Sequence, residues 1–226
     1  MALINFNLGG SAFAAGFPRF IDTLIGCALA WFGVSFIWPD WKFRRLPRTI
    51  QRSIEAQCNY LSEVVQQYHE GKNNALNYRV VRRAAHNTDA EVASLISTLA
   101  TEPNIDPTQK SLAFEFLCLS HTFLSYIAAL GAHRAQIHDQ EVLALLDQAL
   151  DDIKGTLLRD EVPDLSAQNM LQTIRQRLST HDEGDPKSLI ILQQLSLMFG
   201  ILTRLSMLKQ SLSHEPNQDG TEFASL

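Results

Sequence analysis

The segment from Phe20 to Trp38 constrains this chain most, because fourteen of its nineteen side chains are apolar. Its one charge, Asp22, stands near the start of the segment. A helix of roughly 20 apolar residues spans the hydrocarbon core of a bilayer. Trp38 and Trp41 stand at the end of the segment, where indole rings favour the lipid headgroups. The sequence therefore predicts a transmembrane helix over residues 19–41.

Basic side chains follow this segment at once. They are Lys42, Arg44, Arg45, Arg48 and Arg52. The cytoplasmic flanks of membrane helices carry such an excess of Lys and Arg. We therefore predict a cytoplasmic location for everything after the segment, with these five side chains as a basic patch at the membrane surface. Residues 40–86 hold nine Lys and Arg against four Asp and Glu, whereas residues 87–226 hold nine against nineteen.

The chain divides into four predicted parts. Residues 1–18 are apolar but interrupted by Asn, Gly and Ser, which indicates a non-cytoplasmic segment, the tail of a membrane domain. The membrane helix over 19–41 follows, then a cytoplasmic helical domain over 42–212 and a flexible tail over 213–226. The alternative for the apolar segment is a buried helix of a soluble protein, and the tryptophans and the basic cluster argue against it.

Helical periodicity after the membrane segment predicts an all-α fold, with a cytoplasmic bundle of about six helices. Pro47 is expected to open the first of these helices and Gly71 to end it, and Pro107 is expected to open the third. The last helix could be mistaken for a second membrane span, but Gln193 and Arg204 interrupt it, so we expect a core helix. The expected ranges are 47–70, 75–101, 107–136, 139–158, 166–180 and 187–211.

Two pairs of side chains have a spacing that could serve acid–base chemistry or metal binding. His86 and Asp89, with Glu91 nearby, share a helix face, as do Cys118 and His121. The simpler interpretation of the first pair is solvated side chains with a local hydrogen bond. That of the second is a core thiol beside a hydrogen-bonded histidine. Because no catalytic, nucleotide-binding or metal-binding motif accompanies either pair, the sequence predicts no enzyme, no cofactor and no metal.

Further cationic side chains form two groups. His133, Arg134 and His138 cluster near an expected helix end, where cations favour the exposed carbonyls. Arg79, Arg82 and Arg83 form a basic patch on the second bundle helix. Aromatic side chains do not alternate with these arginines and the chain is acidic overall, so nucleic-acid binding is not expected. Membrane phosphates, or acidic groups in a larger assembly, are the expected partners.

The predicted membrane helix offers two candidate sites. Arg19 and Asp22 are three residues apart and can form an interfacial ion pair at the helix start. The alternative is that they contact a substrate pathway or a coupling proton, since ionisable groups inside membranes are often functional. Gly26, Ala30 and Gly33 are small enough to let another membrane helix approach closely. The partners of that helix would be the remaining membrane helices of a longer protein, or a second copy of the chain.

Three stretches resemble a known family. They are FPRFIDTLIGCALAWFGVSFIWPDW (17–41), YRVVRRAAHNTDAEVASLISTLATEPN (78–104) and LAFEFLCLSHTFLSYIAALGAHR (112–134). Together they resemble the C-terminal part of the YccS/YhfK family of bacterial inner-membrane proteins, which is similar to the fusaric acid resistance and aromatic acid exporter proteins. Members of this family are much longer, with two hydrophobic blocks that are each followed by a cytoplasmic region. The resemblance implies that residues 17–41 are the last transmembrane helix and that the rest is the terminal cytoplasmic domain.

Two functions are therefore expected. The first is the C-terminal portion of an inner-membrane efflux protein of the fusaric acid resistance-like class, which is not competent for transport alone because one helix encloses no pathway. The alternative is a membrane-tethered helical module that binds or regulates a partner and has no transport role.

Overall fold

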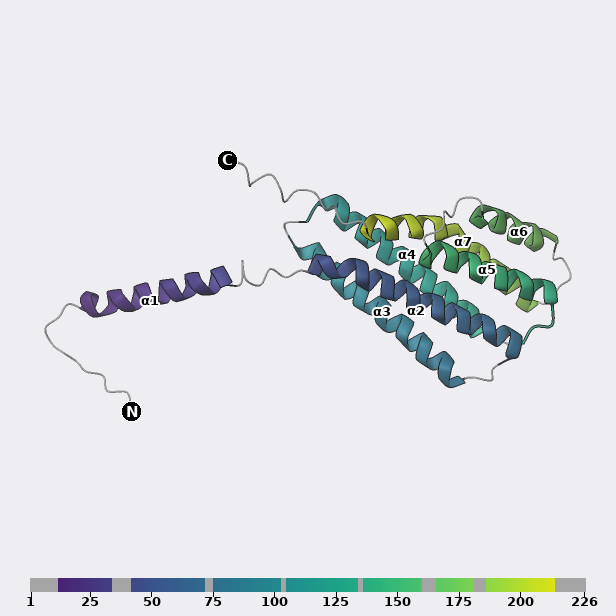
Figure 1. Cartoon of the computed structure of the whole chain (residues 1–226), viewed down its shortest axis with the longest axis horizontal. Helices are drawn as coiled ribbons and strands as arrows, with labels where there is room; N and C mark the ends of the chain where they lie inside the picture. The colour runs from purple at the N-terminus through teal and green to yellow at the C-terminus, as the bar shows by residue number, and fades with distance from the viewer. Residues whose placement is uncertain are drawn as a thin grey trace. The chain divides into compact units, whose positions relative to one another are not determined.

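The computed structural model describes residues 12–33, 42–71, 75–102, 105–133, 136–159, 166–180 and 186–213. These residues form seven helices and no strand, which confirms the all-α prediction for the described part of the chain. The chain divides into two compact units, Met1–Trp41 and Lys42–Leu226. Figure 1 shows the first as the single helix α1 and the second as a bundle of the other six helices.

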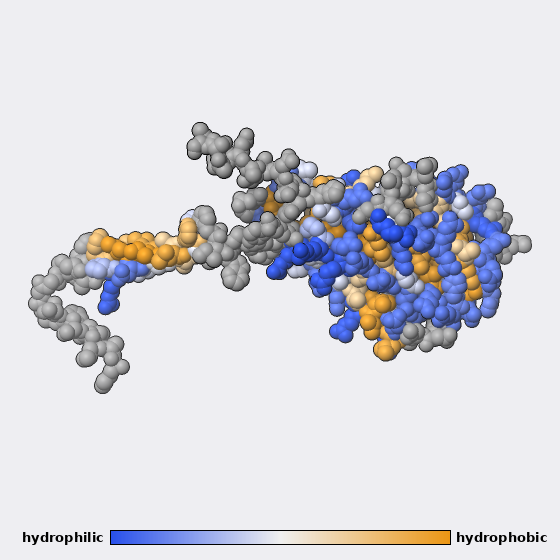
Figure 2. All heavy atoms as spheres, in the orientation of Figure 1, coloured by the Kyte–Doolittle hydropathy of each residue, from blue (hydrophilic) through white to orange (hydrophobic). Residues whose placement is uncertain are grey.

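The helix α1 spans Ala12–Phe32 and contains Pro18. It begins earlier than the expected residue 19, because the alanine-rich run before Pro18 favours helix. Eight large apolar side chains of α1 are between 39% and 69% exposed, and Figure 2 shows a largely orange, hydrophobic surface along this helix. They are Phe17, Phe20, Ile21, Leu24, Ile25, Leu29, Trp31 and Phe32.

Parts of the predicted division lie outside the described residues. They are the start of the predicted non-cytoplasmic segment (1–11), the end of the membrane segment with Trp38 and Trp41, and the predicted flexible tail beyond Ser213.

The bundle helices follow the predicted order. They are α2 (Lys42–Glu70), α3 (Ala75–Thr101), α4 (Pro107–Ala132), α5 (Gln140–Leu158), α6 (Ser166–Thr180) and α7 (Pro186–Ser213). Pro47 lies inside α2 and does not open it, so that prediction is wrong. The helix extends upstream because Leu46 is buried one turn before the buried Ile50. The helix α4 ends before the expected residue 136, because the buried Ile137 turns back and its backbone N–H donates to the Tyr68 carbonyl.

Local signals explain several helix ends. The Asp106 side chain accepts a hydrogen bond from the Thr108 amide and caps α4 directly before Pro107. Asp139 caps α5 in the same way, through the amides of Glu141 and Val142. Gly71 follows α2 with a φ of +80°, a left-handed conformation in which glycine carries no Cβ penalty.

The helix α2 lies at the centre of the bundle and contacts α3, α4, α5 and α7. It runs antiparallel to α3, since Tyr60 shares a 2.9 Å hydrogen bond with Tyr78 while Arg52, earlier on α2, lies 3.9 Å from Glu91, later on α3. It runs parallel to α4, since Gln57 Nε2 donates to Ser120 Oγ at 2.9 Å and the Tyr68 hydroxyl donates to the Leu130 carbonyl at 2.7 Å.

Two described helices, α4 and α7, are long and apolar enough to cross a membrane by length and composition alone. These are two helices where the sequence predicted one, and neither of them is the predicted membrane helix over residues 19–41, of which the structure describes the part up to Gly33. The reason is visible in the packing: α4 contacts α2, α3 and α7, while α7 contacts α2, α4, α5 and α6. A helix with neighbours on several faces needs apolar side chains on several faces. Phe116 and Phe123 of α4 and Leu202 of α7 are fully buried in the bundle.

Candidate functional site at the start of the bundle

The predicted basic patch lies on the first turns of α2. Its members are Lys42, Arg44, Arg45, Arg48 and Arg52, and the side chains of the first two lie outside the described residues. Arg45, Arg48 and Arg52 are exposed. Arg52 Nη1 lies 3.9 Å from Glu91 Oε2 of α3, with both side chains more than half exposed, so this ion pair is weak. Figure 2 shows hydrophilic side chains gathered over the start of α2.

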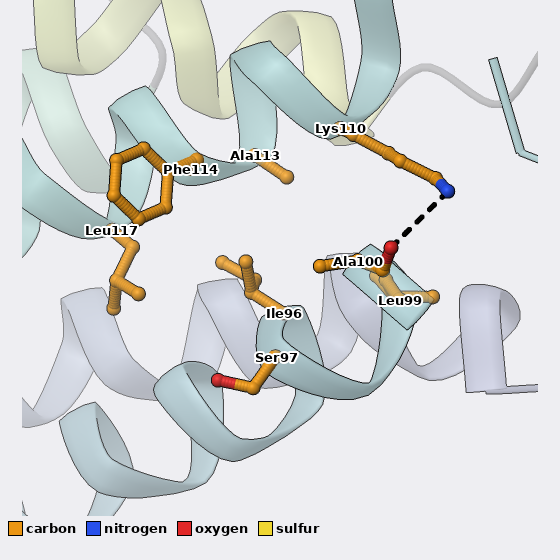
Figure 3. Close-up of a pocket in the computed structure, with 8 residues that line it drawn as sticks. All are labelled: Ile96, Ser97, Leu99, Ala100, Lys110, Ala113, Phe114 and Leu117. Atoms are coloured by element: carbon orange, nitrogen blue, oxygen red, sulfur yellow. Dashed lines mark hydrogen bonds between the residues drawn. The ribbon is translucent and has the colours of Figure 1, made fainter. Parts of the chain in front are cut away.

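An apolar pocket of about 150 Å³ opens between α3 and α4 (Figure 3). Its lining consists of Ile96, Ser97, Leu99, Ala100, Lys110, Ala113, Phe114 and Leu117. Phe114 is 63% exposed, which is unusual for a phenylalanine in a helical bundle. Figure 3 shows Phe114 and Leu117 at one side of the pocket and Lys110 at the other, across from Ile96 and Ala100. The pocket is therefore an apolar recess with one cationic edge.

Lys110 is held by the end of α3. Its Nζ donates to the Ala100 carbonyl at 3.3 Å and to the Glu102 carbonyl. Helix C-termini leave carbonyls without intrahelical partners, and a cation there is favoured by the helix dipole. An ammonium group has three N–H donors, so these two contacts leave one donor for another group.

The pocket and the basic patch lie at the same end of the bundle. The Gln57–Ser120 and Tyr68–Leu130 hydrogen bonds join residues 63 and 62 positions apart on the parallel helices α2 and α4. With the same offset of 63 positions, Phe114 of α4 lies at the same height along the bundle as Gln51 of α2. Gln51 belongs to the first turns of α2, which carry the basic patch. A second, larger and more open recess at this end is lined by Pro47, Arg48, Gln51, Arg52 and Ser213.

Asp89 pairs with His121 and not with His86. His121 Nδ1 lies 2.8 Å from Asp89 Oδ2, and this contact joins α3 to α4. The Asp89 side chain is 8% exposed, so its interpretation as a solvated group is wrong, whereas the His121 side chain is 67% exposed. Asp89 Oδ1 is buried without a hydrogen-bond partner among the described residues. The spacing along one helix did not predict this pair because the partner comes from the neighbouring helix.

The cysteines differ in exposure from the prediction. Cys118 is exposed, so the interpretation as a core thiol is wrong, although the hydrogen bond of His121 is confirmed. Cys58 is the buried thiol, and burial raises its pKa to about 12 against the opposing charges of Lys154 and Lys209. Such a thiol stays protonated and unreactive at neutral pH. Within the described ranges, no three His, Cys, Asp or Glu side chains lie close enough to hold a metal ion.

The candidate residues of α1 are Arg19, Asp22, Gly26, Ala30 and Gly33. Arg19 and Asp22 are both exposed, and this described helix shows no ion pair between them. The Arg19 carbonyl accepts a hydrogen bond from Thr23 Oγ1 at 2.8 Å. Among the described residues, no atom lies within 4 Å of a Cβ placed at Gly26 or Gly33, and Ala30 is exposed. Helix packing at these small residues stays a prediction.

A second exposed apolar patch lies at the opposite end of α3. Leu76 and Val80 are 67% and 58% exposed and lie one turn apart, among the exposed arginines of the second basic patch. Those arginines are Arg79, Arg82 and Arg83. The Tyr60–Tyr78 hydrogen bond places this patch beside the second half of α2. Near this end, His133 is the C-cap residue of α4 and His138 is exposed, while Arg134 lies outside the described residues.

Comparison with known proteins identifies relatives of this chain. It is 43% identical, over 219 residues or 96% of its length, to the inner membrane protein YccS of Escherichia coli. The chain is a relative of YccS. The match covers only 30% of YccS. An uncharacterised protein of Haemophilus influenzae is 36% identical over 63% of the chain, and the uncharacterised protein ORF2 of Neisseria gonorrhoeae is 34% identical over 58%.

The relationship to YccS supports a membrane location, and it confirms the resemblance found in the sequence. The chain spans about a third or less of the length of each of these relatives. No protein-family model matches the chain, and no solved structure matches it significantly.

Two residues of the pocket escaped sequence reasoning, Phe114 and Lys110. Phe114 lies off the apolar stripe that contains Leu112, Phe116 and Leu119, on a face that a helix with one buried side would keep polar. An aromatic residue off the stripe was the available signal. Lys110 gave no signal, because its contact with the end of α3 depends on how the two helices pack.

Proposed function

We propose that this chain is the C-terminal, membrane-attached portion of a YccS-type inner-membrane protein, and that it acts without catalysis. In this proposal α1 crosses the membrane and the bundle lies in the cytoplasm. The observation that carries the proposal is the contrast between the two units. The bundle buries most of its large apolar side chains, whereas eight of those on α1 are exposed. An exposed apolar surface of that extent indicates contact with lipid or with a partner helix.

The polar contacts of α4 and α7 favour α1 as the membrane helix. The α4 side chains of Glu115 and His121 bind Arg204 of α7 and Asp89 of α3. The buried Lys209 of α7 donates to the Leu157 carbonyl at 2.7 Å. Placing either helix in lipid would break these contacts and leave charged groups without partners, which is costly. The stretch of α1 from residue 23 to residue 32 carries no charged side chain.

The orientation follows from the basic patch on α2, because an excess of Lys and Arg marks the cytoplasmic flank of a membrane helix. Within the complete protein we propose a role in the efflux of organic acids, as the fusaric acid resistance-like class suggests. This chain alone would not transport, because a single membrane helix encloses no pathway. It would pack α1 against the remaining membrane helices, through Gly26, Ala30 and Gly33, and would support them from the cytoplasm.

Cys118 provides a test of the orientation without any inserted reporter. Its thiol is exposed on the bundle, Cys58 is buried, and Cys27 lies on α1. A membrane-impermeant maleimide should modify the chain in inside-out membrane vesicles and leave it unmodified in intact spheroplasts. The Cys118→Ser variant should stay unmodified in both preparations. Modification of Cys118 in intact spheroplasts would reverse the proposed orientation.

A membrane-tethered interaction module is the second candidate. It is favoured by the patch on α3, where Leu76 and Val80 are exposed among arginines, a pattern typical of a surface that binds an acidic partner. Two variants of a full-length relative with measurable efflux separate the candidates. If Asp22 takes part in a substrate or proton pathway, Asp22→Asn abolishes efflux at normal protein levels. If the patch is the functional surface, Val80→Ser impairs function and Asp22→Asn does not.

A further inference from the structure

We propose that the pocket between α3 and α4 is a lipid site, in which part of an acyl chain of an anionic phospholipid is held while Phe114 inserts at the membrane surface. The lipid comes from the bilayer that α1 crosses, so this inference rests on the proposed function. The ligand is specified by three features: an apolar recess, an exposed aromatic side chain and a cluster of cations at one end of the bundle.

The recess suits a hydrocarbon group. Six of its eight lining side chains are apolar, and the two polar ones, Ser97 and Lys110, come from different helices. An apolar cavity of roughly this volume can hold a group the size of benzene. Several methylene groups of an acyl chain present the same shape and chemistry. Transfer of the exposed Phe114 ring from water into the membrane interface is favourable. Aromatic and aliphatic side chains insert in this way in helices that lie in the interface.

The charges favour an anionic headgroup. Lys110 uses two of its three donors on the carbonyls of Ala100 and Glu102 at the end of α3, and keeps one for an anion at the rim of the pocket. Arg48 and Arg45 lie exposed on the adjoining turns of α2. Each basic side chain near an anionic membrane surface adds to the attraction, and the effect falls off within about a Debye length. A neutral apolar ligand would have no use for these cations.

The connection to α1 favours a lipid over a soluble partner. Nine residues, 33–41, lie between the end of α1 at Phe32 and the start of α2 at Lys42, so the first turns of α2 are the part of the bundle closest in sequence to the proposed membrane helix. The pocket lies beside the first turns of α2 and is therefore tethered near the bilayer. The other apolar patch, at Leu76 and Val80, lies beside the far half of α2, a helix of 29 residues and thus about 43 Å long. That patch serves as an internal control.

The test uses the full chain in lipid vesicles that carry a nitroxide on the acyl chain, with and without phosphatidylglycerol. Cys27 and Cys58 are replaced, Cys58 by alanine because it is buried, and an environment-sensitive fluorophore is attached either to the native Cys118, one turn after Phe114, or to Val80→Cys in a chain that also carries Cys118→Ser. Both labelled positions are exposed, and Phe114 stays in place. We expect the nitroxide to quench the label at position 118 when phosphatidylglycerol is present, and to leave position 80 unquenched.

Two variants then examine the pocket itself. Ala100→Leu fills the recess from an exposed helical position and should abolish the quenching at position 118. Lys110→Gln removes the cation and should raise the amount of phosphatidylglycerol needed for half-maximal quenching by about fivefold. Equal quenching at positions 118 and 80, no quenching at 118, or quenching that Ala100→Leu leaves unchanged would each overturn the lipid site. Failure of the chain to float with the vesicles would overturn the membrane attachment as well, which distinguishes the two proposals.

Discussion

Replacing Gly131 by alanine should destabilise the bundle, even though alanine is the better helix former. Gly131 is buried near the end of α4. A Cβ at this position would lie 2.8 Å from the Tyr78 hydroxyl, 3.2 Å from the Tyr60 hydroxyl and 3.2 Å from Val64 Cγ2. The two hydroxyls hydrogen-bond to each other at 2.9 Å and both side chains are buried. The added methyl group therefore has to displace a packed pair of tyrosines.

The magnitude follows from three opposing effects. Alanine in place of glycine within a helix gains roughly 0.5–1 kcal/mol. Overpacking a well-filled site costs about 1–3 kcal/mol. Breaking the hydrogen bond between the tyrosines costs about 0.5–1.5 kcal/mol more. The net effect should be a loss of roughly 1–3 kcal/mol in the free energy of unfolding, because the two costs together exceed the gain in helix propensity.

Urea unfolding in detergent, followed by circular dichroism, measures this effect. Gly200→Ala is the matched control, because Gly200 is exposed on α7 and no described atom lies within 4 Å of a Cβ placed there. It should stabilise the chain by roughly 0.5–1 kcal/mol. Adding Tyr78→Phe to Gly131→Ala should recover part of the loss, because it removes the nearest atom. Equal stability of Gly131→Ala and Gly200→Ala would refute the reasoning.

Three further predictions concern the bundle. A fragment spanning residues 42–226 should fold by itself, since its helices bury one another, and a non-cooperative thermal transition followed by circular dichroism would contradict this. Maleimide should modify native Cys118 but reach Cys58 only on unfolding. Burial raises the pKa of the Cys58 thiol from 9.0 to about 12, so the contribution of this thiol to the free energy of unfolding is present below pH 9 and is lost between those two values. The Cys58→Ala variant should remove this pH dependence in urea titrations. Hydrogen bonds from Arg204 hold the pKa of Glu115 below its usual range. The ion pair therefore stabilises the folded bundle at pH values above the ordinary carboxyl pKa, and this stabilisation is lost as the pH falls through the lowered pKa of Glu115. The difference in Tm between the parent chain and Glu115→Gln should therefore shrink on acidification, and a difference that grows would show that the pair is not responsible.

The helices and their order could be predicted from the amino-acid sequence. The ranges expected at 75–101 and 166–180 agree with α3 and α6, because apolar periodicity and the breaks between segments are local properties. The apolar run of α1 and the basic cluster after it are equally local, so they predict a membrane helix without any knowledge of how the helices pack. The stretches that resemble YccS also predict a membrane helix, over residues 17–41.

Which side chains meet depends on tertiary packing. The spacing of His86 and Asp89 describes one face of α3, but the partner of Asp89 is His121, on a different helix. Cys58 and Cys118 look alike in sequence, and only the central position of α2 makes one inert and leaves the other exposed. The pocket at Phe114 and Lys110 exists because α3 and α4 pack antiparallel at their ends. Periodicity reports the face on which a residue lies, while packing determines what that face contacts.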